Sequence, residues 1–379
     1  MNPAELNITF IDSIHQCPRE DWQALLIQLS ISYPFIQFDY LAALEDSHSC
    51  TETTGWKPKH CLIFQAKQLV GFMPCYEKHH SYGEYVFDHQ WAQAYQQQGL
   101  HYYPKLLTAI PFTPCAGPRL IIDKAIDQQY AKDTIIQSIQ TLCDSQHYSG
   151  WHYLFPQQAL KELPSRRGVQ FHWYNKNYLS FDHFLSFFSS RKRKVILKER
   201  RKVEEQGFNL RRIEGTAATA EDWQRFYHFY QLTYAKRSGH GGYLTERFFE
   251  QLAKTFSHQC LLVFANLNNK TVAGALYFKD DESLYGRYWG CYEEFDFLHF
   301  ECCYYQGIDY CIEHKLKHID AGAQGEHKIA RGFEPIYTYS NHYLQHSGFY
   351  EAVKHFCDEE KPHIQSYKKS CFESLPYKK

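Results

Sequence analysis

The sequence predicts an α/β protein of two similar units, each with a mixed sheet flanked by helices. The chain has 379 residues, more than one hydrophobic core usually supports, so two domains are expected. Residues 61–76 (CLIFQAKQLVGFMPCY) and 260–278 (CLLVFANLNNKTVAGALYF) each consist of two apolar segments about a short polar turn. In both halves a helix and a further strand follow. This repeated order predicts an internal duplication.

The first half contains the elements of one complete unit. The hairpin at 61–76 is followed by the apolar segments YYPKLLTAIPFTP and PRLII. A helix is expected in DQQYAKDTIIQSIQTLCDSQ, and a strand at WHYLF. LPSRRG then marks a break in the pattern, which places the domain boundary near 165–180. We therefore assign residues 1–170 to the first domain.

The second half repeats this order, with a third strand, SLYGRYWGCYEE, after the hairpin at 260–278. A helix is expected next, because apolar positions recur every three or four residues: Leu298, Cys302, Tyr305, Ile308, Ile312 and Leu316. The short strand HID and a glycine-rich stretch come after this helix. We assign residues 171–379 to the second domain.

A basic helix is expected at residues 184–206, with Ser189 and Ser190 capping or interrupting it and Gly207 as its end. Within residues 191–202, eight of twelve are Lys or Arg. Four of these cations form one stripe at helical spacing: Arg191, Lys194, Lys198 and Arg201. The stripe could bind the phosphates of a nucleotide-bearing donor, an RNA or an anionic lipid. The alternative is a solvated face that neighbouring glutamates partly neutralise.

Composition and charge exclude several classes of protein. Hydrophobic residues make up 44% of the chain and aromatic residues 17%, which excludes a disordered protein. The formal net charge of −1 excludes a molecule that binds nucleic acid over its whole surface, so no DNA partner is expected. The 13 cysteines include no CxxC pair, and the sequence shows neither a secretory signal pattern nor a membrane span. We expect reduced thiols and a cytoplasmic location.

Common catalytic and metal-binding motifs do not occur. The sequence contains no GxSxG, no Walker A motif and no GxGxxG, which argues against hydrolase, nucleoside triphosphatase and Rossmann classes. Its histidines lack the spacing of zinc sites. We predict neither a metal site nor a permanently bound cofactor.

The stretch 322–335, GAQGEHKIARGFEP, combines glycines with acid, histidine and cationic side chains directly after a predicted strand. Loops beyond strand ends often hold ligands in α/β proteins. Three neighbours are candidate catalytic residues, with Glu326 or His327 as the base and Lys328 as the oxyanion-stabilising group. Five further positions could cradle a cofactor or co-substrate: Gly322, Gln324, Gly325, Arg331 and Gly332. The alternative is a polar connecting loop.

Two aromatic segments with charged residues are candidates for acceptor binding. The first is HHSYGEYVFDHQWAQAY at residues 79–95, followed by HYYPKL, and the second is YGRYWG at residues 285–290. A cation on an aromatic strand must find an acidic partner or face a ligand, and Glu301 is the expected partner of Arg287. The candidate acceptor-binding residues are Glu84, Asp88, Lys105, Arg287, Tyr288 and Glu301.

The motifs HSYGEYVFDHQWAQAY, LYGRYWG, LHFECCYYQGIDYCIE and GAQGEHKIARGFEP resemble the FemAB-like family of predicted N-acyltransferases in the GNAT superfamily. The resemblance covers nearly the whole chain and implies two tandem GNAT-like domains. The family's Asp-x-Gly, lysine and glycine pattern matches Asp320, Gly322, Lys328 and Gly332, which implies a role for Lys328 near the transferred carbonyl. CYEEFDFLHFE replaces the usual GNAT pyrophosphate loop.

We therefore expect an N-acyltransferase that uses acyl-CoA as co-substrate and a small-molecule or peptide amine as acceptor. One alternative is transfer from aminoacyl-tRNA to a peptidoglycan-type or peptide amine, which the basic helix favours. A second alternative, of another class, is a non-catalytic protein that recognises a cell-wall or nucleotide ligand. Only the two transferase hypotheses predict product formation, so an assay for turnover distinguishes them from the non-catalytic protein.

Overall fold

The computed structural model describes residues 5–239, 241–323 and 325–378, and the chain divides into two compact units. Unit 1 comprises Met1–Gly168 and Tyr337–Gln365, and unit 2 comprises Val169–Ile336 and Ser366–Lys379. The division after Gly168 lies beside the boundary expected at residue 170. Residues 337–365 pack with unit 1, whereas the sequence analysis assigned them to the second domain. The reason is that a late strand and part of the last helix return to unit 1.

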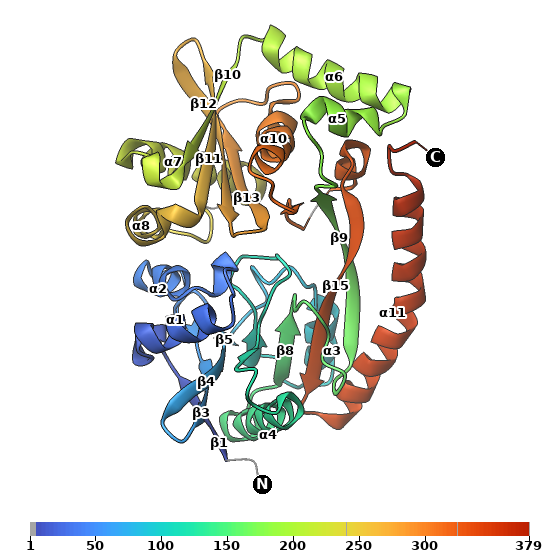
Figure 1. The fold of residues 1–379 in the computed structure, drawn as a ribbon. Coiled ribbons are helices and arrows are strands. Elements are labelled where there is room, and N and C mark those ends of the chain that lie inside the picture. The colour runs from blue at the N-terminus through green and yellow to red at the C-terminus, as the bar shows by residue number, and fades with distance from the viewer. Residues whose placement is uncertain (1–4, 240, 324, 379) are drawn as a thin grey trace. The chain divides into compact units, whose positions relative to one another are not determined.

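Unit 1 contains two sets of strands (Figure 1). The first set is antiparallel, in the order β1 (Leu6–Ile11), β3 (His60–Gln65), β4 (Gln68–Met73) and β7 (Ile121–Ile122). The second set has the order β2 (Trp56–Pro58), β5 (Cys75–Lys78), β6 (Lys105–Thr108), β8 (Gly150–Leu154) and β15 (Glu334–Leu344). The helices are α1 (Arg19–Gln28), α2 (Phe38–Asp46), α3 (His89–Gln97) and α4 (Gln128–Gln146).

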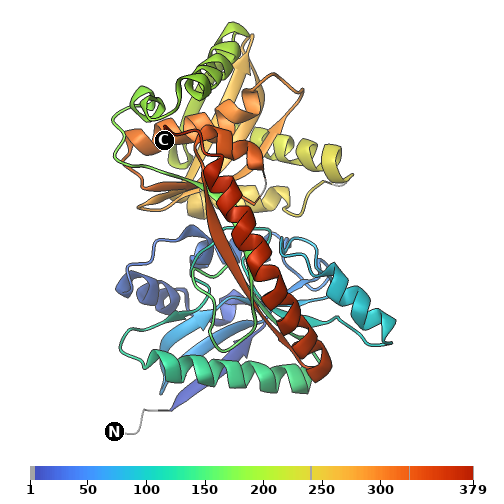
Figure 2. The same ribbon diagram turned by 90° about the vertical axis from the view of Figure 1, so that its right-hand side faces the viewer.

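The predicted hairpin and helix of the first half are both present in unit 1. The segment at 61–76 forms β3, β4 and the start of β5. Helix α4 begins after Asp127, whose carboxylate accepts hydrogen bonds from the first-turn amides of Gln129 and Tyr130. The helix buries Ala131, Ile135, Ile139 and Cys143, one per turn, and packs on β1 and β8 (Figure 2). It connects β6 to the parallel strand β8.

Unit 2 repeats this arrangement. Its strands have the order β10 (Asn209–Glu214), β11 (Cys260–Leu267), β12 (Lys270–Lys279), β13 (Ser283–Cys291), β14 (His318–Asp320) and β9 (Ser165–Tyr174). The pairs are antiparallel except β13 and β14, which are parallel. The connection between these two runs through α9 (Leu298–Phe300), a π-helical turn (Glu301–Tyr305) and α10 (Gln306–Glu313). In both units an antiparallel series is thus followed by a parallel pair joined through a helix and then by one further antiparallel strand, as the predicted duplication requires.

Helices α7 (Ala220–Ser238) and α10 pack on opposite faces of this sheet. A Cβ atom at Gly290 of β13 would lie 1.9 Å from the main-chain oxygen of Phe229 on α7, so only glycine permits this close approach. On the other face, Ile308 of α10 packs with Tyr277 and Leu284 in the core. Helix α8 (Glu246–Gln251) lies beside α7 (Figure 1).

The predicted basic helix is two helices, α5 (Phe181–Ser186) and α6 (Ser190–Glu205). Ser189 occupies the N-cap position of α6, so the serine pair interrupts the helix. Helix α6 buries Ile196, Glu199 and Val203. The stripe on its outer face is exposed, as expected for a solvated or ligand-binding surface: Arg191, Lys194, Lys198 and Arg201.

The last helix, α11 (Ser347–Glu373), has 27 residues and is the long red helix of Figure 2. Residues up to Gln365 belong to unit 1 and those from Ser366 to unit 2. Neither α11 nor any other helix in the described part of the chain is both long enough and apolar enough to cross a membrane.

Candidate functional site

A small cavity in unit 2 lies where the pairing of β13 with β14 ends. The parallel register joins Ser283–Tyr285 to His318–Asp320, and β13 then continues to Cys291. The ladder between β13 and β12 shifts register at this point, because Leu276 pairs with Tyr288 and Tyr277 with Gly286, which leaves Arg287 as the bulged residue. Bulges bend a strand and redirect its side chains, and they are common beside active sites.

The cavity has a volume of about 90 Å³. Its walls include residues of β13 and of the helical segment after it: Arg287, Tyr288, Trp289, His299, Cys303 and Tyr304. Ala321, the first residue after β14, closes one side. The cavity is therefore bounded by the bulged strand, the helix and the start of the predicted loop.

Asp320 begins this loop and is fully buried. One carboxylate oxygen accepts a hydrogen bond from the Gly322 amide at 2.8 Å, and the other lies 3.5 Å from Nε2 of His172. Burial alone would raise the pKa of Asp320, but His172, the Gly322 amide and Arg287 hold that pKa well below its ordinary value. Asp320 is thus a fixed anion that orients the loop, and Arg287 lies within range of its charge.

Lys328 closes the loop from the inside. The short helical turn Glu326–Arg331 carries it, and its side chain is only 1% exposed. Its Nζ donates hydrogen bonds to the main-chain oxygens of Ala321 at 2.8 Å and Gly322 at 2.7 Å. Burial raises the pKa of the Cys303 thiol in the cavity wall, and the nearby Lys328 charge opposes this rise. The structure therefore places a buried ammonium group beside the cavity.

His327 and Tyr304 form a polar pair next to this ammonium group. The Tyr304 hydroxyl lies 2.8 Å from Nε2 of His327. Burial, Arg331 and Lys328 lower the pKa of His327, so its ring is neutral at pH 7 and can accept a proton. His299, in the cavity wall, has a pKa lowered to about 3 by burial and the neighbouring His327. The neutral imidazole of His299 and the Tyr304 hydroxyl thus line the cavity, and the neutral imidazole of the exposed His327 contacts that hydroxyl.

The remaining residues of the predicted loop hold its shape or lie at its edge. Glu326 is exposed, and its Oε1 accepts a 2.6 Å hydrogen bond from the Tyr367 hydroxyl. Gly325 has φ 111°, and a Cβ there would meet the His327 ring at 2.1 Å. Gly332 ends the turn, and its carbonyl accepts from the Tyr377 hydroxyl at 2.7 Å. Gln324 lies outside the described residues.

Arg331 links the loop to α6. It is 5% exposed, and one guanidinium nitrogen donates to both carboxylate oxygens of Glu199, at 2.8 and 2.9 Å. Another donates to the main-chain oxygen of His327 at 2.7 Å, and the group lies 3.4 Å above the ring of Phe300. Glu199 is therefore a buried partner of Arg331 and not part of a solvated face.

The expected pairing of Glu301 with Arg287 was wrong. Glu301 forms an ion pair with Arg200 of α6 at 3.0 Å and accepts a hydrogen bond from Gln306 at 2.8 Å. Arg200 also pairs with Asp309 of α10 at 2.8 Å. The inward-facing side of α6 supplies this arginine, so the cation nearest to Glu301 comes from a helix that the sequence interpretation treated as exposed.

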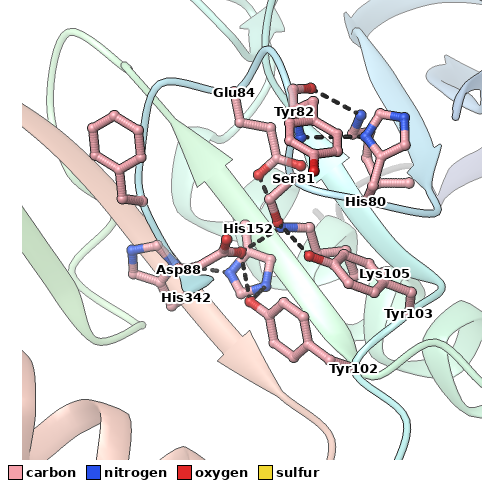
Figure 3. A network of polar contacts seen from close by, with 12 residues as sticks. His80, Ser81, Tyr82, Glu84, Asp88, Tyr102, Tyr103, Lys105, His152 and His342 are labelled. Carbon is pink, nitrogen blue, oxygen red and sulfur yellow. Dashed lines mark hydrogen bonds and ion pairs between the residues drawn. The ribbon is translucent and has the colours of Figure 1, made fainter. Parts of the chain in front are cut away.

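Three other predicted residues meet in unit 1 (Figure 3). Lys105 of β6 is fully buried, and its Nζ donates to Oε2 of Glu84 at 2.8 Å and to Oδ2 of Asp88. Tyr102 donates to the same Asp88 oxygen at 2.7 Å and lies 3.0 Å from Nε2 of His152. Glu84 and Asp88 come from the loop between β5 and α3. The cluster therefore ties this loop to the strands below it.

The environment of the Lys105 cluster shifts the pKa values of the Glu84 and Asp88 carboxylates in opposite directions. Burial raises the pKa of Glu84 to about 7, although Lys105 opposes the rise. For Asp88, burial is outweighed by Lys105, which holds its pKa below the ordinary value. The pKa of Lys105 is raised, because Glu84 and Asp88 outweigh the effect of burial. Asp88 thus carries the charge that neutralises Lys105.

Sequence interpretation missed His299, Cys303 and Tyr304 as cavity residues. Their segment, LHFECCYY, entered as the apolar stripe of a helix and as part of a family motif, without a role for these three residues. His299 and Cys303 are four residues apart and therefore share one helical face, a signal that was present in the sequence. The cavity has no counterpart in the sequence pattern, because it depends on the bulge at Arg287.

Two α/β units, each with a parallel strand pair joined through a helix, define a tandem GNAT-like fold, and the candidate site follows the second pair. A family model described as FemAB-like, peptidoglycan biosynthesis/recognition, matches residues 13–379. The chain belongs to this FemAB-like family. No curated protein matches the sequence significantly.

Solved structures share the fold at low sequence identity. A crystal structure of FemX aligns with a TM-score of 0.54 and 13% identity, covering 92% of this chain and 100% of FemX. L-PGS from Bacillus licheniformis aligns with a TM-score of 0.52 and 9% identity, covering 88% of this chain and 96% of L-PGS. The C-terminal domain of a putative lysylphosphatidylglycerol synthetase from Agrobacterium fabrum aligns with a TM-score of 0.52 and 7% identity. The alignment covers 90% of this chain and 95% of that domain. At such low identities these structural alignments show a common fold and no more.

Proposed function

We propose that the protein transfers a small acyl or aminoacyl group to an amine at the cavity beside Lys328. The observation that carries this proposal is the buried ammonium group of Lys328 next to a cavity that also contains Tyr304, the partner of a neutral His327. Membership of a family described by peptidoglycan biosynthesis/recognition supports it. The aminoacyl alternative is also in keeping with one structural relative, the C-terminal domain of a protein named as a putative lysylphosphatidylglycerol synthetase.

The chemistry requires a neutral amine and a site for negative charge. The amine nitrogen attacks the carbonyl carbon of a thioester or ester, and a tetrahedral oxyanion forms. Lys328 stabilises this oxyanion, a contribution worth about 10² to 10³ in rate for one donor group. The nitrogen's proton passes through the Tyr304 hydroxyl to Nε2 of His327, a base contribution of about 10² to 10⁴. Collapse of the intermediate forms the amide and breaks the bond from the carbonyl carbon to the thioester sulfur or ester oxygen. The proton held by His327 returns through Tyr304 to that leaving atom, which departs as the thiol or the ribose hydroxyl.

The cavity limits the size of the transferred group. Its volume of about 90 Å³ equals that of about three water molecules in the liquid, at about 30 Å³ each. An acetyl group or a small aminoacyl group fits this space. Arg287 and Tyr288 in the wall are the proposed contacts to the incoming substrates.

The charge distribution of unit 2 favours a tRNA-borne donor. Three exposed acids, Glu293, Glu294 and Asp296, precede the helical segment that follows β13, where a pyrophosphate would have to approach a helix N-terminus. The exposed cationic stripe of α6 offers the opposite sign to an RNA backbone. We therefore place aminoacyl-tRNA first and acyl-CoA second, the reverse of the order that the sequence interpretation favoured.

Glu84, Asp88 and Lys105 have a different role in this proposal. Their side chains are at least 96% buried, and Lys105 binds both carboxylates. We assign the cluster to fixing residues 79–88, a loop whose exposed Tyr82 and Phe87 present aromatic surface to the solvent. The sequence predicted that these three residues touch the acceptor themselves, whereas in this proposal they act only by holding the loop at residues 79–88 in place.

Single-turnover assays test the proposed reaction. The enzyme is mixed with a lysine-containing peptide and with either acetyl-CoA or tRNA charged with alanine, glycine or serine. Product with charged tRNA alone supports the first donor, and product with acetyl-CoA alone supports the second. Binding of the peptide with no product from any donor would contradict transfer and favour a recognition protein.

A further inference from the structure

Arg331 of unit 2 is held on three sides. One nitrogen of its guanidinium group donates to both carboxylate oxygens of Glu199 on α6, at 2.8 and 2.9 Å. Another nitrogen donates to the main-chain oxygen of His327 at 2.7 Å, and the group lies 3.4 Å from the centre of the Phe300 ring. A planar guanidinium group makes these directed contacts at the same time, which a lysine ammonium group on its flexible stem does not. Arg331 therefore has a fixed direction as well as a charge.

Glu199 anchors this arginine to α6. It is 6% exposed and lies on the buried side of its helix with Ile196 and Val203. The Tyr305 hydroxyl donates a further hydrogen bond to Oε2 of Glu199. Breaking a buried ion pair leaves an uncompensated charge, so the pair opposes movement of either side chain. The turn that carries Arg331 is thereby tied to α6.

The His327 ring needs such support because it is exposed. On one side it fits against Gly325, where a Cβ atom would lie 2.1 Å from Cε1 of the ring. On another side its Nε2 lies 2.8 Å from the Tyr304 hydroxyl. The Phe300 ring contacts both His327, with ring centroids 5.5 Å apart, and Arg331. The position of the imidazole therefore depends on Arg331, through the His327 carbonyl and through Phe300.

Charge acts on the same ring. Burial lowers the pKa of His327, and the positive charges of Arg331 and Lys328 lower it further. The titratable groups that face the ring come from the helical segment after β13 and from its own turn: His299, Tyr304, Lys328 and Arg331. Arg331 thus has two effects at His327, a restraint on position and a nearby positive charge.

We propose that Arg331, anchored on Glu199, is the positioning residue that holds the His327 imidazole against the Tyr304 hydroxyl. The inference deepens the proposed transfer reaction and rests on it, because His327 is the proton acceptor there. Within the described part of the chain, Arg331 is not a wall residue of the cavity, so we assign it no contact with a substrate. This indirect role replaces the co-substrate contact expected from the sequence.

The competing explanation is that Arg331 only fastens α6 to the rest of unit 2. Arg200 provides the matched control, because it also extends from α6 and pairs with two carboxylates, those of Glu301 at 3.0 Å and Asp309 at 2.8 Å. These partners lie on the helical segment and not on the turn at 326–331. If fastening alone mattered, loss of either arginine would disturb His327 to the same extent.

The first experiment follows the His327 ring directly, by NMR of protein labelled with ¹⁵N at its histidines, with the signal assigned from His327→Gln. In the wild type we expect a lowered pKa and a single neutral tautomer with its proton on Nδ1, because Nε2 accepts from Tyr304. Glu199→Gln/Arg331→Met removes both partners and leaves neither as an unpaired buried charge. In this variant the pKa of His327 should rise, because a positive neighbour is gone, and the second tautomer should appear.

Two further variants separate direction from charge and from packing. Arg331→Lys keeps the positive charge but not the fork of donors, so the pKa of His327 should stay low while the second tautomer appears. Arg200→Met/Asp309→Asn removes the neighbouring ion pair of α6 and should leave both quantities as in the wild type. An unchanged His327 tautomer in either Arg331 variant, or equal changes in the control, would overturn the proposal.

The pH profile of transfer, normalised to the folded fraction, gives the second readout. In Glu199→Gln/Arg331→Met the acidic limb of kcat should move to higher pH as the pKa of His327 rises. The value of kcat at pH 7 should fall by up to about 10²-fold, because the base is misplaced. KM for the donor and the acceptor should stay unchanged, since neither residue touches them. A raised KM with unchanged kcat would make Arg331 a binding residue and overturn the proposal.

The two experiments distinguish failure of this inference from failure of the proposed function, because the NMR titration needs no substrate. The expected His327 signals, together with no product from any donor, would contradict transfer and support the positioning role. Transfer by a protein whose His327 ring is unaffected by loss of Arg331 would support the reaction and overturn the positioning role.

Discussion

Two of the buried lysines, Lys105 of unit 1 and Lys328 of unit 2, are held in different ways. In unit 1, Lys105 binds the carboxylates of Glu84 and Asp88. In unit 2, Lys328 binds the main-chain oxygens of Ala321 and Gly322, which carry partial charge only. The first lysine is neutralised by its carboxylate partners, whereas the second donates to main-chain oxygens beside a cavity. The comparison separates a structural lysine from one suited to stabilising a developing anion.

The largest expected effect is on the stability of unit 1. Lys105→Met removes the cation and leaves Asp88 as a buried, uncompensated charge, which typically costs about 3 to 5 kcal/mol. Urea denaturation should show this loss in the free energy of unfolding. Lys105→Met/Asp88→Asn should recover part of it, because the buried charge is gone. A Lys105→Met protein as stable as the wild type would show that Lys105 is not the partner that stabilises Asp88.

The next effect concerns the base. His327→Gln should lower the rate of transfer by about 10² or more, because the proton acceptor is lost. In the wild type, the rate should fall as the pH decreases through the lowered pKa of His327, since protonation removes the base. The groups that face this ring are His299, Tyr304, Lys328 and Arg331. If the variant retains the acidic limb of the pH profile, another group, with His299 the nearest, is the base.

The α6 stripe should have a more moderate effect on binding of charged tRNA. Lys194→Glu/Lys198→Glu reverses two exposed charges and should weaken tRNA binding at least tenfold while reducing its dependence on salt. Filter binding across a range of salt concentrations measures both quantities. Lys354→Glu/Lys361→Glu, on α11, is the matched control. Equal losses in the two double variants would remove α6 from the donor site.

The last effect, small over any one pH unit, is a pH dependence of stability in unit 1. The pKa of Glu84 is about 7 in the folded protein and about 4.3 in an unfolded chain. The folded state therefore binds more protons in this window, and the contribution of Glu84 to stability decreases as the pH rises towards 7. The charges facing Glu84 are Lys78, Asp88 and Lys105. Glu84→Gln should gain stability relative to the wild type as the pH rises from about 4.3 to about 7, by at most about 1.4 kcal/mol per pH unit. If the difference in the free energy of unfolding between Glu84→Gln and the wild type does not change with pH, the raised pKa assigned to Glu84 is contradicted.

Much of the fold was predictable, because hydrophobic period and turn residues are local signals. The hairpin at 61–76, the helix that became α4 and the break at Ser189 follow from such patterns. The candidate site was predictable only where its residues are neighbours in sequence, as in GAQGEHKIARGFEP. The partners of Glu301 and Arg331 come from the inner face of α6, and which face points inward is decided by packing between distant segments. The cavity depends on one bulged residue, for which the sequence gives no sign.

The most direct test of the account is the single-turnover rate of Lys328→Met, normalised to the folded fraction, with Lys270→Met at an exposed hairpin as the matched control. Lys328→Met should lose about 10² to 10³ in rate. Its loss of stability should be smaller than that of Lys105→Met, at about 1 to 3 kcal/mol, because two buried carbonyls and not a carboxylate lose their donor. Lys270→Met should behave as the wild type. Undiminished transfer by folded Lys328→Met would contradict the central claim that this buried ammonium group stabilises the transition state.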